Sequence, residues 1–167
     1  MLAALDKPSE TLDGPETAFV AAVRNYGWFR TQVLADGEGP SFAFSTGFWL
    51  SVKQPEILIF SMRSDLAHDV LWDLFRRAER GEALPVGRRT DQVFANVPAC
   101  LFPIDRRRYA EYLGWSRWFY CGDDFPCLQL VWPDRAGLFP WEQGFDAAFE
   151  GDQIDLTEFG WKAELRQ

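Results

Sequence analysis

The chain has 167 residues, 47% of them hydrophobic, so it fits one domain with a substantial core. Its net charge of −8 disfavours binding to nucleic acid or to an anionic membrane, because both require a positive surface. The mean hydropathy of −0.22 is typical of a soluble protein, and no apolar run approaches the roughly 18 residues of a membrane span.

The N-terminal segment and the cysteines predict a cytoplasmic protein. Residues 1–13 are expected to form a loose leader, and they lack the continuous apolar segment of a secretory signal. The three cysteines are an odd number without a dense disulfide framework, and reduced thiols are typical of the cytoplasm.

The first regular elements are a helix and a hairpin. Asp13 offers a capping side chain before the helix, and Gly27 is the expected residue after its last turn. Apolar residues recur between them at helical spacing. Residues 28–34 and 41–49 then read as two strands that pair as a β-hairpin.

The middle of the chain alternates between strand and helix. Residues 56–60 predict a short apolar strand, and Ser64 is the expected cap of an amphipathic helix that ends at Gly81. A strand is predicted over residues 92–102, where Pro98 marks an edge or a bulge.

The last elements complete an α+β fold. Residues 105–113 predict a short helix, residues 115–120 an irregular aromatic segment, and residues 125–132 a strand. This order predicts a mainly antiparallel sheet with helices packed on it, in a single compact domain over residues 14–145. The acidic segment 146–167 carries apolar residues, and we expect it to dock on the core or on a partner.

Several motifs occur in an order that resembles a known family. They are Tyr26-Gly27-Trp28, residues 41–48, residues 55–59, the helix after Ser64, and the closing Trp132-Pro133-Asp134 with Phe139-Pro140-Trp141. Over residues 14–142 the chain resembles the bacterial family known as domain of unknown function 4262. The resemblance implies a conserved single-domain architecture, and it implies no particular reaction, cofactor or catalytic residue.

The sequence predicts neither a catalytic residue nor a cofactor. His68 is the single histidine, which excludes a multi-histidine metal site within one chain. It is retained as a candidate catalytic base, against the simpler interpretation of a helix histidine with a local hydrogen bond. Cys121 and Cys127 are spaced too widely for a structural zinc site, and no nucleophile motif surrounds Cys121.

Candidate ligand-binding residues come from a strand end, an aromatic turn and an arginine-rich loop. They are Thr46, Trp132, Asp134, Trp141, Arg88 and Arg89. We expect a cleft between the Thr46 strand end and the Trp132 turn, although both also suit a purely structural role. Arg88 and Arg89, with the arginines at 106–108, are able to clamp a phosphate or a carboxylate; the alternative is a solvated, neutralised face.

Three classes of function are consistent with these observations. The prediction is a non-enzymatic binding protein that recognises a protein partner or a small ligand, because no paired catalytic motif is present. Its acidity also suits an immunity-type partner of a basic toxin. The alternatives are a small hydrolase or transferase with an aromatic cleft, and an anion- or nucleotide-binding regulator. We expect a monomer or homodimer that binds no nucleic acid and no membrane.

Overall fold

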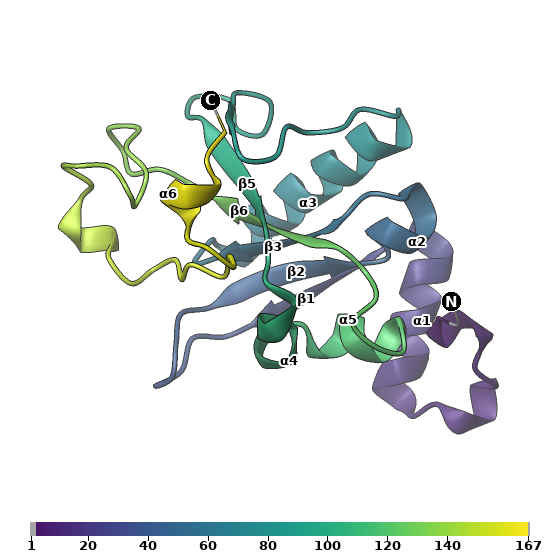
Figure 1. Cartoon of the computed structure of the whole chain (residues 1–167). Coiled ribbons are helices and arrows are strands. Elements are labelled where there is room, and N and C mark those ends of the chain that lie inside the picture. The colour runs from purple at the N-terminus through teal and green to yellow at the C-terminus, as the bar shows by residue number, and fades with distance from the viewer. Residues whose placement is uncertain (1–2, 167) are drawn as a thin grey trace.

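A mixed β-sheet organises the computed structural model, which describes residues 3–166 (Figure 1). Its strand order is β1-β2-β3-β6-β5-β4, and only β3 and β6 run parallel among the paired strands described. The strands are β1 Phe29–Val33, β2 Phe42–Thr46, β3 Glu56–Phe60, β4 Arg89–Thr90, β5 Ala99–Pro103 and β6 Cys127–Val131. The α-helices are α1 Gly14–Tyr26, α2 Phe48–Val52, α3 Ser64–Glu79, α4 Tyr109–Tyr112, α5 Gly114–Phe119 and α6 Trp161–Glu164. The predicted α+β class with a mostly antiparallel sheet is confirmed.

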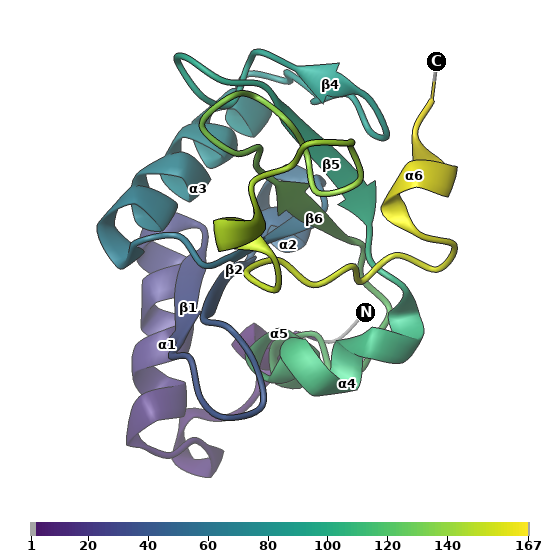
Figure 2. The ribbon, with the colours of Figure 1, turned by 90° about the vertical axis from the view of Figure 1, so that its left-hand side faces the viewer.

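The two largest of three apolar clusters lie on opposite faces of the sheet, because successive side chains of a strand point to opposite faces. Ile57 and Ile59 of β3 face α3 and pack with Leu71. Leu58, between them, joins the core on the opposite face, where α1, α4 and α5 lie (Figure 2). The edge strand β1, which has no further strand beside it, therefore has α1 on one face and α3 on the other.

The segment from α1 to β2 follows the sequence prediction closely. Asp13 and Glu16 form a reciprocal capping box at the start of α1, and Gly27 ends the helix with a φ of 90°. The hairpin is antiparallel, with Thr31 opposite Phe44. Local capping and alternation signals were sufficient here, because each acts within a few residues.

The second predicted strand was too long, because the chain turns into α2 at Gly47. Gly47 has a φ of 118°, and a Cβ there would lie 2.4 Å from the Gly27 carbonyl oxygen. Glycine is the residue that accepts both this conformation and this close backbone approach. Phe48 and Trp49 are therefore helical instead of extended.

Other predicted elements also needed correction. Ser64 is the first residue of α3 and makes no capping bond; its Oγ instead accepts a hydrogen bond from Arg30. Residues 92–98 contain no strand, since β5 begins at Ala99. Most of the segment 115–120, which was predicted to be irregular, is helical and belongs to α5. Its Trp115 and Phe119, four residues apart on one side of the helix, both pack on Phe19 of α1.

Both terminal segments contact the core. Ala3 and Ala4 are buried in it, and Leu5 and Leu12 pack against it. At the other end Leu156 is fully buried, and Trp161 donates its indole N–H to Gln129 of β6. Segment 146–166 therefore docks on the chain's own sheet. In residues 3–166 no helix combines the length and the apolar character that a membrane crossing requires.

Candidate functional site

A mainly apolar hollow lies between α1, β1 and α3, which are neighbours at one side of the molecule (Figure 2). Its volume is about 480 Å³, within the range of small-ligand pockets. We call it the aromatic groove and define it by six of its lining residues. These are Tyr26, Trp28, Arg30, His68, Asp69 and Trp72.

Three rings in the aromatic groove lie in a slanted stack. The ring centroid of Trp28 lies 5.5 Å from that of His68 and 5.7 Å from that of Trp72, with interplanar angles of 25° and 38°. His68 and Trp72 are four residues apart on α3, so their rings share one side of the helix. Trp28 is buried, whereas His68 is exposed, so the stack leads from the core to solvent. This arrangement offers aromatic faces to a flat group.

Two residues of the groove carry buried hydrogen-bond donors without a partner. The indole Nε1 of Trp28 and the Nε of Arg30 have no acceptor among the described residues. Another nitrogen of the Arg30 guanidinium, Nη1, is held in place, because it donates hydrogen bonds to Ser64 and to Gln32 Oε1. Buried donors are normally paired, and an unpaired one costs about 1–3 kcal/mol. A bound acceptor would remove this cost.

Charged groups of both signs border the aromatic groove. Asp69 lies at its solvent side, and the Arg76 guanidinium lies 5.0 Å from the centroid of the Trp72 ring. His68 makes no hydrogen bond to a carboxylate or thiol among the described residues. A catalytic histidine needs both a substrate-facing nitrogen and a group that orients the ring, so the geometry supplies only part of such a site.

Thr46 lies outside the aromatic groove, in a buried polar network at the start of β3. Its Oγ1 lies 2.6 Å from Ser116 Oγ. Next to it, the Glu56 carboxylate is fully buried and accepts hydrogen bonds from five donors. These are Ser45 Oγ, the backbone N–H groups of Gly47, Phe48 and Trp49, and the Tyr120 hydroxyl. The network joins β2, α2, β3 and α5, so it has a structural role.

Burial dominates the ionisation of Glu56. Loss of solvent raises the pKa of its carboxyl to about 7, although the hydrogen bonds from Tyr120 and the α2 backbone lower it again. Burial and the Glu56 charge also raise the pKa of Tyr120. The sequence reasoning missed this group, and the available signal was a lone glutamate at the start of an otherwise apolar strand.

The expected cleft between Thr46 and the Trp132 turn is not formed. Because β2 and β3 are antiparallel, Thr46 lies beside the first residue of β3. Trp132 follows the parallel strand β6 and donates its indole N–H to the carbonyl of Phe60, the last residue of β3. The two segments therefore lie at opposite ends of the strands.

Asp134 closes the turn that follows Trp132. Its carboxylate accepts hydrogen bonds from the backbone N–H groups of Ala136, Leu138 and Asp146. These bonds help to lower the pKa of Asp134, against the opposing effect of desolvation. The acceptor positions are thus used within the turn, as the structural alternative predicted.

Arg89 and Trp141 are brought into one cluster. The Arg89 guanidinium bonds to Glu142 and lies 5.0 Å from the Phe139 ring, which stacks on Trp141 at 4.8 Å. Arg88, one residue earlier, is exposed. Arg89 was expected to bind an anion, and its guanidinium is instead paired with the Glu142 carboxylate.

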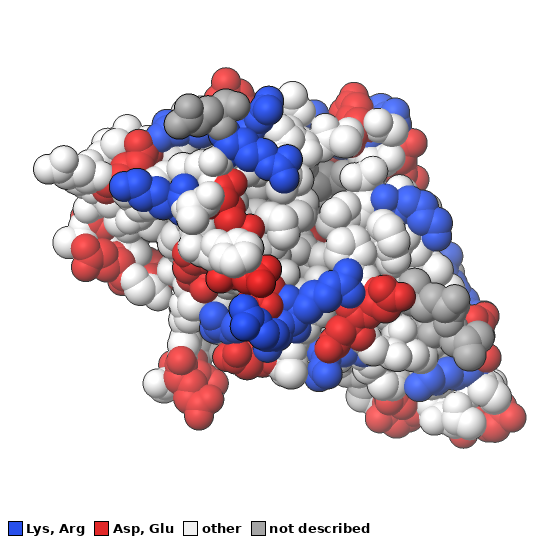
Figure 3. All heavy atoms as spheres, in the orientation of Figure 1, with Lys and Arg blue, Asp and Glu red and all other residues white. Residues whose placement is uncertain are grey.

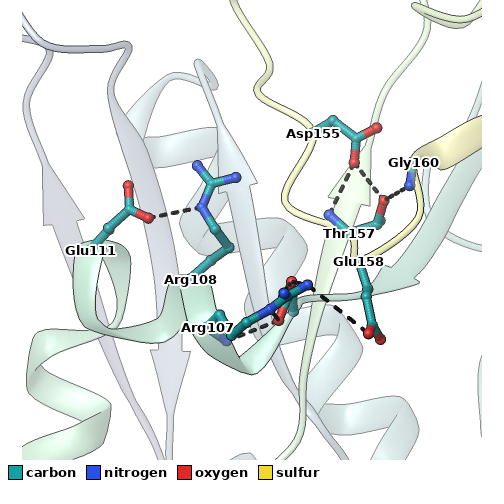
Figure 4. A network of polar contacts seen from close by, with 8 residues as sticks. Arg107, Arg108, Glu111, Asp155, Thr157, Glu158 and Gly160 are labelled. Atoms are coloured by element: carbon teal, nitrogen blue, oxygen red, sulfur yellow. Dashed lines mark hydrogen bonds and ion pairs between the residues drawn. The ribbon is translucent and has the colours of Figure 1, made fainter.

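The arginines at 106–108 are also paired with acids. Arg107 contacts Asp105 and Glu158, and Arg108 contacts Glu111 (Figure 4). On the face shown in Figure 3, Lys and Arg side chains alternate with Asp and Glu side chains in the same way. Taken together, these arginines form separate ion pairs instead of one anion-binding cluster.

The cysteines do not form a metal centre. Cys100 and Cys127 are buried and Cys121 is exposed, and all three are free thiols. Within residues 3–166, no three His, Cys, Asp or Glu side chains are grouped so that they could hold a metal ion.

The fold and the groove define an α+β domain with an aromatic recess at its free sheet edge. A family model described as "Domain of unknown function (DUF4262)" matches residues 22–146, which is most of the chain. The chain therefore belongs to this family. All six residues that define the aromatic groove lie within the matched segment. Comparisons with curated proteins and with solved structures gave no match.

Proposed function

We propose that this protein is a non-enzymatic binding protein that recognises an aromatic group in the aromatic groove. One observation carries the proposal: two buried donors, on Trp28 and Arg30, lack acceptors beside a stack of three rings. A ligand that combines a flat ring with a hydrogen-bond acceptor complements both features. The free thiols support a cytoplasmic location for this activity.

The geometry gives each part of the ligand a partner. The flat ring packs on the exposed side of the stack, where Trp72 and His68 supply aromatic faces. The N–H groups of Trp28 and Arg30 are covered in this conformation, and an acceptor that reaches either of them after a movement of the groove side chains removes its desolvation cost. Hydrolase chemistry has less support, since His68 lacks an orienting partner among the described residues.

A pair of uncharged probes tests this proposal. Indole-3-acetamide carries a flat ring and a carbonyl acceptor, and cyclohexylacetamide carries the same acceptor on a saturated ring. Isothermal titration should show saturable binding of the indole compound, weaker by at least about tenfold for the saturated one. Trp72→Ala should lose a similar factor, whereas Phe159→Ala, at an exposed ring outside the groove, should not.

Two results would contradict the proposal. Equal affinity for the two probes would show that the rings do not recognise an aromatic group. Unchanged affinity in Trp72→Ala, with wild-type affinity in the Phe159 control, would place the binding site elsewhere.

A further inference from the structure

The strand β1 has one unpaired edge, and its orientation follows from the hydrogen bonds of its neighbours. Ser61 N–H donates to Ser41 C=O, so the residue pair 41/61 is hydrogen-bonded across β2 and β3. Antiparallel bonding alternates along a strand, so Phe42 and Phe44 direct their backbone groups toward β1. The backbone groups of Arg30 and Gln32 consequently point away from the sheet. In the described chain, no residue outside the sheet makes a backbone–backbone hydrogen bond to either of them.

Two hollows that share lining residues lie beside this edge. A second hollow of about 360 Å³ adjoins the aromatic groove, and both are lined by Phe29 and Arg30. Its other walls come from the first half of α1 and from Thr31 and Gln32 of β1. At about 3.3 Å per residue, the five residues of β1 span about 17 Å, which is close to the length of α1 alongside them (Figure 2). The edge strand and the helix beside it are thus of similar length.

Unpaired polar atoms are concentrated along the same edge. Residues 3–166 contain four buried side-chain polar atoms without a hydrogen-bond partner. Three of them belong to Trp28, Arg30 and Thr31, and the fourth to Glu164. Buried unpaired groups are rare, and three of them fall within the four residues at the start of this edge strand.

We propose that an extended peptide of a partner protein adds to the free edge of β1 as a further strand. This inference rests on the proposed function: the aromatic group in the groove is a side chain of that peptide. The peptide backbone pairs with the outward N–H and C=O groups of Arg30 and Gln32. A basic residue two positions from the aromatic one, on the same side of the added strand, pairs with Asp69, in keeping with the net charge of −8.

A peptide fits this edge better than a second copy of the chain. All five residues of β1 are half-buried, so the edge is recessed between its flanking helices. A second copy would have to bring its own α1 and α3 into the same space. Two chains of charge −8 also repel each other, whereas a basic peptide is attracted.

Backbone methylation of peptides tests strand addition directly. The probes are capped pentapeptides with a central tryptophan, a lysine two residues later on the same side of the strand, and threonine and valine at the other positions. In one version the backbone amides of alternate residues are N-methylated, and in its twin the intervening amides are methylated. Only one set faces β1 in a paired strand, so one version should lose at least about tenfold in affinity while its twin retains it.

Amide exchange of the protein gives an independent readout. In the unmethylated complex, exchange of the Arg30 and Gln32 amides should slow by about tenfold or more. The Thr31 amide, which faces β2, serves as the internal control. Gln32→Pro removes one outward N–H at an edge position where proline is tolerated, and it should weaken the peptide.

The outcomes separate the two proposals. If indole-3-acetamide binds while both methylated versions match the parent peptide, strand addition is wrong and the proposed function stands. The same conclusion follows if no peptide binds better than indole-3-acetamide. If a peptide shows the predicted methylation pattern but Trp72→Ala leaves its affinity unchanged, the edge binds a strand and the proposed aromatic recognition fails.

Discussion

Replacement of Glu56 by glutamine tests the physical role of the buried network. In the native chain one carboxylate oxygen accepts from Ser45 Oγ and Phe48 N, and the other from Gly47 N, Trp49 N and the Tyr120 hydroxyl. Glutamine converts one of these acceptors to a donor. In either orientation of its amide, the new NH₂ group faces at least one backbone N–H.

The expected loss of stability in Glu56→Gln follows from the number of N–H donors left without an acceptor. One buried N–H without an acceptor costs about 1–3 kcal/mol. The glutamine amide has the lower cost in the orientation that leaves only the Phe48 N–H without an acceptor. We therefore expect Glu56→Gln to lower the free energy of unfolding by about 1–3 kcal/mol at neutral pH. The side-chain volume hardly changes, so packing contributes little.

The same variant should alter the pH dependence of stability. In the folded chain the pKa of Glu56 is about 7, against an ordinary value of 4.5. The folded state therefore binds this proton more tightly than the unfolded state. The stabilisation is fully present below pH 4.5 and is lost as pH rises through about 7, a change on the order of 3 kcal/mol.

Urea unfolding at pH 5 and at pH 8 measures both effects. Glu56→Gln has no proton to lose, so its stability deficit relative to wild type should be larger at pH 5 than at pH 8. Glu150→Gln removes an exposed carboxylate and controls for net charge. An equal deficit at the two pH values would refute the account of a proton held by burial, and wild-type stability throughout would refute the network itself.

Three further predictions concern the fold. Gly47→Ala should destabilise the protein by about 2 kcal/mol or more in urea unfolding, since its Cβ would lie 2.7 Å from Trp28 Cα in a strained backbone conformation; a smaller loss would contradict the close approach. Leu156→Ala should cost about 2–4 kcal/mol in the same assay, because the side chain is fully buried, whereas an undocked C-terminal segment would lose almost nothing. Ellman's reagent should titrate one thiol, Cys121, in the native protein and three after unfolding, and fast reaction of a second native thiol would contradict the burial of the other two.

The sequence predicted elements whose signals are local. The cap at Asp13, the glycine after α1 and the apolar run of β3 each act within a few residues, and the structure confirms all three. The family was also indicated by its motifs, and the match over residues 22–146 confirms it. Elements that depend on distant contacts were missed. The turn at Gly47 is one such case, because it depends on the backbone around Gly27, twenty residues earlier in the chain.

The candidate site was less predictable, because it is assembled from separate elements. Tyr26 and Trp28 precede β1, whereas His68 and Trp72 belong to α3. Of these four residues, only His68 was predicted from the sequence as a candidate site residue. A pair of aromatic residues at i, i+4 on α3 was the one local signal. Glu56 was missed for a related reason: its donors come from α2 and α5, whose positions depend on tertiary packing.

The most direct test of the central claim is the indole N–H signal of Trp28 in a ¹⁵N–¹H correlation spectrum. The account predicts that indole-3-acetamide shifts this signal downfield as its carbonyl supplies the missing acceptor, while the indole signal of Trp161, which already donates to Gln129, stays in place. If neither the Trp28 indole signal nor the Arg30 Nε–H signal moves at a concentration that saturates binding, the aromatic groove is not the recognition site.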